Sequence, residues 1–136
     1  MKAVLDTNVI VSAVLSSHGA PAALLRAWVE GAFELIASPL LLEELERVLA
    51  YPKLRQFIST EDAADLVDLI GRQSMMVDDP TDKPPVRSPD PGDDYLIALA
   101  AYARAVLVTG DGDLLGLADQ IPVRTAAEFL TGLDLR

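Results

Sequence analysis

The sequence predicts a single α/β domain, a three-layer α/β/α sandwich around a mainly parallel sheet. Short uninterrupted apolar runs, such as residues 2–5 and 105–108, alternate with longer segments of helical periodicity. Polar and acidic residues come directly after two of these runs, at Asp6 and at 109–113. A chain of 136 residues with 51% hydrophobic content fits one domain, residues 1–136, with a substantial core.

The first half of the chain alternates strand and helix. We expect strands at 2–5 and 33–37 and helices at 7–15 and 22–30. Ser38 is a favoured N-cap and Pro39 fits a first turn, so a helix begins there and runs to about residue 50. Ser59 or Thr60 caps the next helix, which ends near residues 71–72.

The second half begins with a weak strand at 75–77 and one long loop. Five of the nine prolines lie between residues 79 and 92. After this loop we expect a helix at 93–104, a strand at 105–108, a helical turn at 114–118 and an edge strand at 121–123. Thr125 and Glu128 are spaced as the capping box of a final helix.

Composition excludes several classes of protein. The absence of Cys excludes disulfides, a thiolate nucleophile and a Cys-based zinc site. We find no secretory signal and no apolar run long enough to span a membrane, so we expect a cytoplasmic protein. A net charge of −10 argues against passive nucleic-acid binding, but it is compatible with a nuclease whose acids bind cations, and it favours a basic partner.

Two acids stand out in the first half. Asp6 ends a buried strand, where ligands of parallel sheets bind, although its alternative role is the N-cap of the following helix. Asn8 is either a turn residue or an amide that supports such a site. Glu44 falls within the apolar stripe of its helix, whereas Glu43 belongs to the solvent-exposed face. A Glu on a core-facing stripe is destabilising unless it is paired or bound to a metal ion.

The acids of the second half have competing structural roles. Asp90 and Asp93 are spaced as a cap and a third helical residue, which leaves Asp94 as the functional candidate and the role of Asp93 open. Thr109 and Asp111 follow the strand at 105–108 directly, while Asp113 either supports the site or caps the next helix.

Together, Asp6, Glu44, Asp94 and Asp111 would meet at one edge of the sheet. Several carboxylates at close range repel one another unless a divalent cation neutralises them. Oxygen ligands without His or Cys favour Mg²⁺ or Mn²⁺, and such ions promote phosphodiester hydrolysis. We therefore expect a metal-dependent hydrolase acting on phosphodiester bonds.

Four segments in this order resemble the PIN-domain ribonucleases, most of all the PIN toxins of VapBC-type toxin–antitoxin pairs. They are Val4–Ile10, Ser38–Leu45 with Val48–Leu49, Asp90–Ala98 and Val108–Leu114. The resemblance implies a parallel five-stranded sheet of order 3-2-1-4-5 and Mg²⁺- or Mn²⁺-dependent cleavage of RNA. It further implies a homodimer and an antitoxin that inserts into the acidic site.

The same resemblance assigns roles to residues. Asp6, Glu44 and Asp94 correspond to the family's acidic triad and Asp111 to its fourth acid, all of them metal ligands. Asn8 and Thr109 correspond to polar neighbours that hold water or metal.

Two other functions compete with this hypothesis. A haloacid-dehalogenase-like phosphatase has acidic motifs similar to residues 5–8 and 110–113. Such an enzyme needs a second Asp where Asn8 stands and a nearby Lys, and this function leaves Glu44 unexplained. A catalytically weak PIN-like module that binds a protein partner is favoured by the net charge and disfavoured by the complete set of acids.

Overall fold

Five short strands form one parallel sheet in the order β3-β2-β1-β4-β5, which confirms the order implied by the resemblance. The computed structural model describes residues 1–133. The strands are β1 (Lys2–Leu5), β2 (Glu34–Ala37), β3 (Met75–Met76), β4 (Val106–Val108) and β5 (Val123–Arg124). Because all of them run in the same direction, their carboxyl ends lie along a single edge of the sheet.

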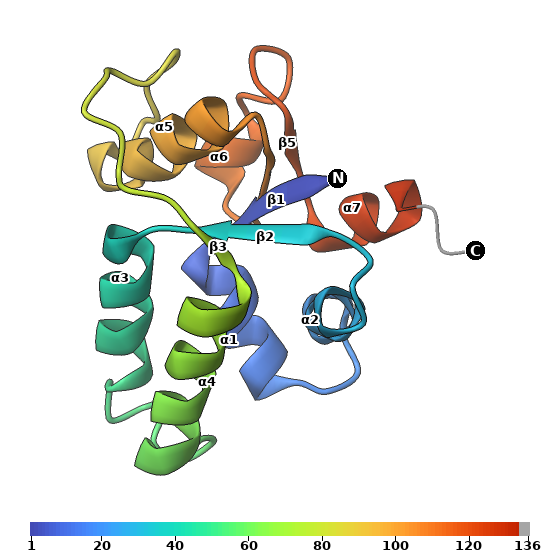
Figure 1. Ribbon diagram of the computed structural model, residues 1–136, viewed down its shortest axis with the longest axis vertical. Coiled ribbons are helices and arrows are strands. Elements are labelled where there is room, and N and C mark those ends of the chain that lie inside the picture. Colours follow the sequence, from blue (N-terminus) through green and yellow to red (C-terminus); the bar gives the residue numbers. More distant parts are fainter. Residues whose placement is uncertain (134–136) are drawn as a thin grey trace.

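Helices cover both faces of this sheet and complete the three-layer sandwich (Figure 1). The helices are α1 (Thr7–Leu15), α2 (Ala20–Val29), α3 (Pro39–Leu49), α4 (Thr60–Gln73), α5 (Asp94–Ala103), α6 (Gly112–Leu115) and α7 (Ala126–Gly132). The helices α1 to α4 lie on one side, and α5 and α6 lie on the other (Figure 1). A 3-10 turn, η1 (Pro91–Asp93), precedes α5.

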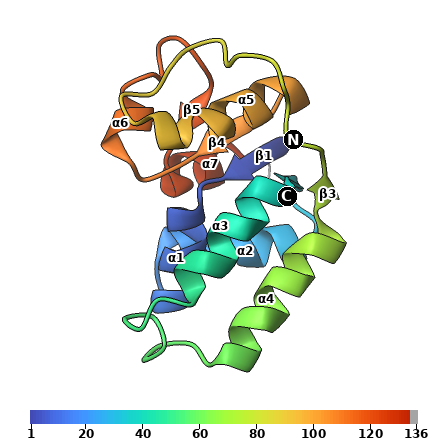
Figure 2. The same ribbon diagram turned by 90° about the vertical axis from the view of Figure 1, so that its left-hand side faces the viewer.

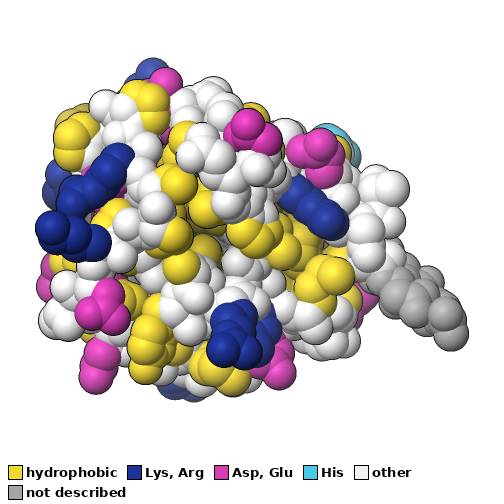
Figure 3. All heavy atoms as spheres, turned by 90° about the horizontal axis from the view of Figure 1, so that it is seen from above, with side chains coloured by type: hydrophobic (Ala, Val, Ile, Leu, Met, Phe, Trp, Pro, Cys, Tyr) yellow, Lys and Arg dark blue, Asp and Glu magenta, His cyan; other side chains and the backbone are white. Residues whose placement is uncertain are grey.

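The core lies along both faces of the central strands. The side chains of Ala3, Val4 and Leu5 in β1 are completely buried, as expected for a strand covered by helices on both sides. Leu45 of α3 and Phe129 of α7 are completely buried as well. On the side of α5 and α6, apolar side chains are exposed across the middle of the surface, with charges of both signs around them (Figure 3). The negative charge of the protein is therefore not concentrated there.

The helix starts follow the polar signals in the sequence. Ser38 accepts a hydrogen bond from the backbone N–H of Leu41, and Ser59 caps α4 in the same manner. Thr125 and Glu128 form the predicted capping box of α7. These side chains satisfy N–H groups that a first helical turn leaves free, and so they fix where each helix begins.

The boundaries differ from the sequence prediction in the short elements. The edge strand is Val123–Arg124 rather than 121–123, because Pro122 has no N–H to give to the ladder. The short helix α6 begins at Gly112, two residues before the expected start at residue 114, because Asp111 caps it. The helix α2 begins at Ala20, before Pro21, which fits a first turn.

Within residues 1–133, no single helix is long and apolar enough to cross a membrane. The pair α1 and α2, which meet at an angle of 102°, satisfies the length and composition criteria together.

Candidate active site

The candidate site lies at the carboxyl edge of the sheet, where β1 and β4 end side by side. This edge is the left side of Figure 1 and faces the viewer in Figure 2. Leu5 pairs with Val108, and the backbone N–H of Asp6 donates to the carbonyl of Val108 at 2.9 Å. This register places Asp6 next to Thr109, although 103 residues separate them in the chain.

Asp6 is a buried carboxylate with 3% of its surface exposed. It accepts hydrogen bonds from the Thr109 hydroxyl at 2.8 Å and from the backbone N–H of Asn8 at 3.3 Å. Burial is the main cause that raises the pKa of Asp6; these hydrogen bonds oppose it, and the charges of Glu44 and Asp111 raise it further. Asp6 thus both caps α1 and faces other acids, so its two possible roles are combined.

Thr109 connects Asp6 with Asp111. Its completely buried hydroxyl donates to Asp6 and accepts from the backbone N–H of Asp111 at 3.0 Å. Asp111 caps α6 by accepting from the N–H of Asp113 at 3.0 Å, and the side chain of Asp113 is exposed in the first turn. The structure therefore brings Asp111 to the site and leaves Asp113 at its periphery.

Glu44 approaches the same edge from α3. Its side chain is 28% exposed, while Glu43 lies on the exposed face of the helix. The hydroxyl of Tyr95 donates a hydrogen bond to Glu44 Oε2, and Arg47 lies 3.8 Å from Oε1. Burial, the hydrogen bond to Glu44 and the surrounding negative charges raise the pKa of Tyr95, so its hydroxyl remains a donor at neutral pH.

Asp93, at the end of η1, also belongs to this group. Its pKa is raised to about 7, first by burial, then by a side-chain hydrogen bond with Asp111 and by the charges of Asp6, Asp90 and Asp111. A carboxyl group perturbed by several others in this way lies among them. Asp90 itself has the structural role expected from the sequence, because it accepts from the N–H of Gly92 at 3.0 Å.

Within residues 1–133, no recorded side-chain contact links Asp94 to this group, and its charge is not among those that raise the pKa of Asp6 or Asp93. One oxygen of Asp94 accepts from the backbone N–H of Ser88 at 2.8 Å, and the other pairs with Arg87 at 3.2 Å. Both partners lie in the proline-rich loop after β3. Asp79, at the start of that loop, accepts from the N–H of Leu40 at 3.0 Å. Asp79 and Asp94 therefore attach the loop to α3 and α5.

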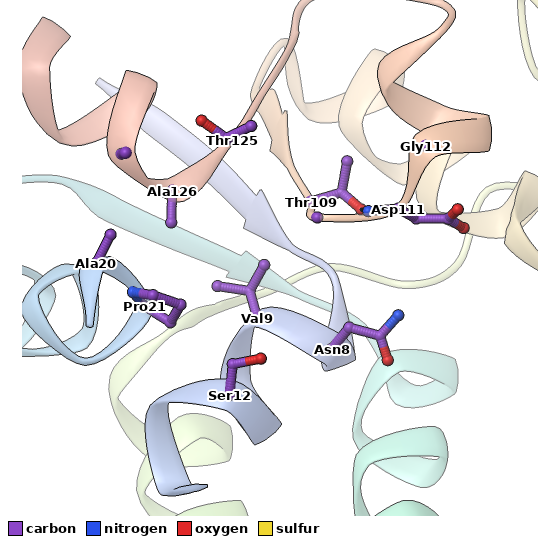
Figure 4. A pocket seen from close by; sticks show the side chains of 12 residues that line it. Asn8, Val9, Ser12, Ala20, Pro21, Thr109, Asp111, Gly112, Thr125 and Ala126 are labelled. Atoms are coloured by element: carbon purple, nitrogen blue, oxygen red, sulfur yellow. Dashed lines mark hydrogen bonds between the residues drawn. The ribbon is translucent and has the colours of Figure 1, made fainter. Parts of the chain in front are cut away.

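Two open pockets include residues of this group in their lining. One has a volume of about 740 Å³ and includes Asn8, Thr109 and Asp111 in its lining. Figure 4 shows that the side chains of Asn8 and Asp111 lie at the same end of this pocket. The other, of about 340 Å³, is lined by Glu44, Arg47 and Tyr95 among others. Asp111 and Glu44 thus each line an open pocket, whereas Asp6 is buried.

The chemistry of these residues fits a hard divalent cation. Asp6, Glu44, Asp93 and Asp111 offer carboxylate oxygens, with a hydroxyl and an amide beside them, and neither Cys nor His is present. Across residues 1–133, no three acidic, His or Cys side chains stand close enough to form a ready-made chelate. Charge effects on the pKa values of Asp6 and Asp93 nevertheless connect these acids with one another.

Comparison with known proteins identifies the family. The family model described as PIN domain matches residues 2–113, and the chain belongs to this family of nucleases. An uncharacterized protein of Methanocaldococcus jannaschii is 30% identical over 121 residues, which cover 88% of this chain and 77% of that protein.

Two solved structures have a similar fold. One is VapBC2 from Rickettsia felis bound to a DNA fragment from their promoter, with a TM-score of 0.59 and 17% identity, covering 91% of this chain and 97% of the other. The second is FitAcB from Neisseria gonorrhoeae, with a TM-score of 0.55 and 18% identity, covering 92% and 98%. At these identities the similarity concerns the fold alone.

The sequence named Asp93 only as a supporting polar residue of the site, because a capping pattern already explained it, and it gave no sign of the role of Tyr95. Asp93 is the last residue of the 3-10 turn, and the charges of Asp6, Asp90 and Asp111 raise its pKa. The Pro-Gly pair before Asp93 was the available signal of such a turn.

Proposed function

We propose that this PIN-domain protein is a metal-dependent endoribonuclease, with Mg²⁺ or Mn²⁺ as its cofactor. The observation that carries the proposal is the grouping of Asp6, Glu44, Asp93 and Asp111. These acids come from four separate segments, and the effects on the pKa of Asp6 and Asp93 connect them electrostatically. A protein keeps several unneutralised carboxylates together at a cost, and a cation removes that cost.

In this proposal the four carboxylates hold the cation. The cation supplies the positive charge that lowers the pKa of a water molecule and stabilises charge on the phosphate. Thr109 keeps Asp6 and the backbone at Asp111 in place through its two hydrogen bonds, and so it limits their movement before substrate binds. Asn8, exposed at the pocket wall, is available to orient water or substrate.

The open shape of the site supports a polynucleotide substrate. A single strand can lie across the acids with neighbouring nucleotides in the two pockets. The choice of RNA rests on the resemblance to PIN ribonucleases. In keeping with this substrate, we place the protein in the cytoplasm.

The net charge of −10 supports regulation by a basic partner. We propose that this partner is an antitoxin protein, since the fold is similar to that of VapBC2 and the sequence resembles VapBC-type toxins. A homodimer is part of the same proposal, and light scattering of the purified protein measures it. Binding of this partner would inhibit the nuclease, because a basic segment would neutralise the same acids as the cation.

The test of the function is a cleavage assay with single-stranded RNA. We expect cleavage with Mn²⁺, none with EDTA, and none for Asp6→Asn at the same Mn²⁺ concentration. Asp65→Asn is the matched control, because Asp65 is exposed on α4, away from the carboxyl edge, and its loss should leave the rate unchanged. Cleavage that persists in EDTA and in Asp6→Asn would contradict the proposal.

A further inference from the structure

Tyr95 makes the only side-chain hydrogen bond recorded for Glu44 within residues 1–133, and it does so from a different helix. The donor lies in the first turn of α5 and the acceptor in the middle of α3, 51 residues apart in sequence. Both side chains are partly buried. This contact therefore connects two of the segments that contribute acids to the site.

The two oxygens of Glu44 have different surroundings. Oε2 accepts from Tyr95, while Oε1 lies 3.8 Å from the Arg47 guanidinium. The Arg47 side chain is 66% exposed, and an ion pair of this kind holds a carboxylate weakly. Tyr95 is held more firmly, because the residues that follow it, Leu96 and Ile97, are buried in the core. The orientation of Glu44 is therefore set by Tyr95 rather than by Arg47.

We propose that Tyr95 is a positioning residue: its hydroxyl holds Oε2 of Glu44 and so fixes the orientation of the carboxylate that would bind the cation. This inference rests on the proposed function, since it takes Glu44 as a metal ligand. Outer groups that hydrogen-bond a ligating carboxylate fix its orientation, and their loss commonly weakens metal binding by about 10–100-fold. The positive charge of Arg47, 3.8 Å from Oε1, does not prevent this metal binding, because its side chain is largely exposed.

The experiment compares Tyr95→Phe with Tyr102→Phe. Tyr102 lies on the same helix and is 66% exposed, so its variant controls for the loss of a phenol hydroxyl from α5. Calorimetric titration with Mn²⁺ measures the affinity without any need for activity. We expect about tenfold weaker Mn²⁺ binding for Tyr95→Phe and unchanged binding for Tyr102→Phe.

Two further measurements separate positioning from a general effect on the fold. In a Glu44→Gln background, Tyr95→Phe should cause no additional loss of Mn²⁺ affinity, because its effect passes through Glu44. The RNA-cleavage rate of Tyr95→Phe should also recover when the Mn²⁺ concentration is raised about tenfold, in line with the weaker affinity. Tyr95→Leu, which also lacks a donor, should reproduce the loss if Tyr95→Phe folds poorly.

The outcomes distinguish this inference from the proposed function. Wild-type protein that binds Mn²⁺ and cleaves RNA, together with unaltered affinity in Tyr95→Phe, overturns the role of Tyr95 alone. An equal loss of Mn²⁺ affinity on Tyr95→Phe in the wild-type and Glu44→Gln backgrounds also overturns it. Wild-type protein that neither binds Mn²⁺ nor cleaves RNA overturns the proposed function and this inference with it.

Discussion

The hydroxyl of Thr109 donates a 2.8 Å hydrogen bond to the carboxylate of Asp6, across the pairing of β4 with β1. The same oxygen accepts the backbone N–H of Asp111 at 3.0 Å. One completely buried hydroxyl thus fixes the positions of two acids that lie far apart in the sequence. The arrangement follows from the sheet itself, because neighbouring parallel strands end next to each other.

Replacing Thr109 with Val should destabilise the protein by about 1–3 kcal/mol, because it leaves a buried carboxylate with one donor fewer and an N–H without its acceptor. Urea denaturation of the metal-free protein measures the change. Thr131→Val is the control: Thr131 is exposed and donates only to the Ala127 carbonyl within α7, so its loss should cost less than about 0.5 kcal/mol. Equal effects of the two substitutions would contradict the structural role of Thr109.

The neighbours Asp93 and Asp94 should respond differently to the same substitution. Asp93→Asn removes a carboxylate from the acidic group, and we expect the RNA-cleavage rate to fall about 100-fold or more, since even outer-shell partners of a metal cost 10–100-fold. Asp94→Asn weakens the contact with Arg87 in the loop, so we expect about 1 kcal/mol lower stability and largely retained cleavage. The reverse pattern would assign the site role to Asp94, as the sequence alone favoured.

The raised pKa of Asp93 predicts how stability depends on pH without metal. Its ordinary value is 3.8 and the folded value is about 7, so between these values the folded state binds more protons than the unfolded state. This contribution to stability is complete below about pH 4 and is lost as the pH rises to about 7; the raised pKa of Asp6 acts in the same direction. As the pH rises between these values, the Tm of Asp93→Asn in EDTA should therefore increase relative to the Tm of the wild type. A constant difference in Tm across that range would contradict the assignment.

Bound metal should restore the stability that the protein loses at neutral pH when Asp93 ionises. We expect Mn²⁺ to raise the Tm of the wild type, by the equivalent of about 2.7 kcal/mol at a concentration 100 times the Kd. EDTA should reverse the increase, and Asp6→Asn should show little of it. Thermal unfolding followed by circular dichroism at pH 7.5 measures these changes; an equal increase for wild type and Asp6→Asn would show that Mn²⁺ binds elsewhere.

Much of the fold could be predicted from the sequence because its signals are local. Continuous apolar runs such as Val4–Leu5 and Leu107–Val108 mark buried parallel strands, and Ser38 and Thr125 mark helix starts by capping them. The boundaries of the short elements at the sheet edge were predicted less accurately. These elements contain two to four residues each, so tertiary contacts rather than local preferences decide their ends.

The site could be predicted only in part. Asp6 and Asp111 follow strands, and Glu44 interrupts an apolar stripe, so each carries a signal in the sequence. The choice between Asp93 and Asp94 depends on the 3-10 turn that ends at Asp93 and on contacts with Arg87 and Ser88 in an irregular loop. Those contacts are tertiary, and no periodic pattern encodes them.

A crystal structure of the protein soaked with Mn²⁺ tests the central claim most directly, since anomalous diffraction locates the ion independently of activity. We expect a peak within about 2.3 Å of a carboxylate oxygen of Asp6, with at least one of Glu44, Asp93 and Asp111 as a further ligand. A well-occupied Mn²⁺ elsewhere on the protein, or no peak beside Asp6 at saturating Mn²⁺, would contradict the account.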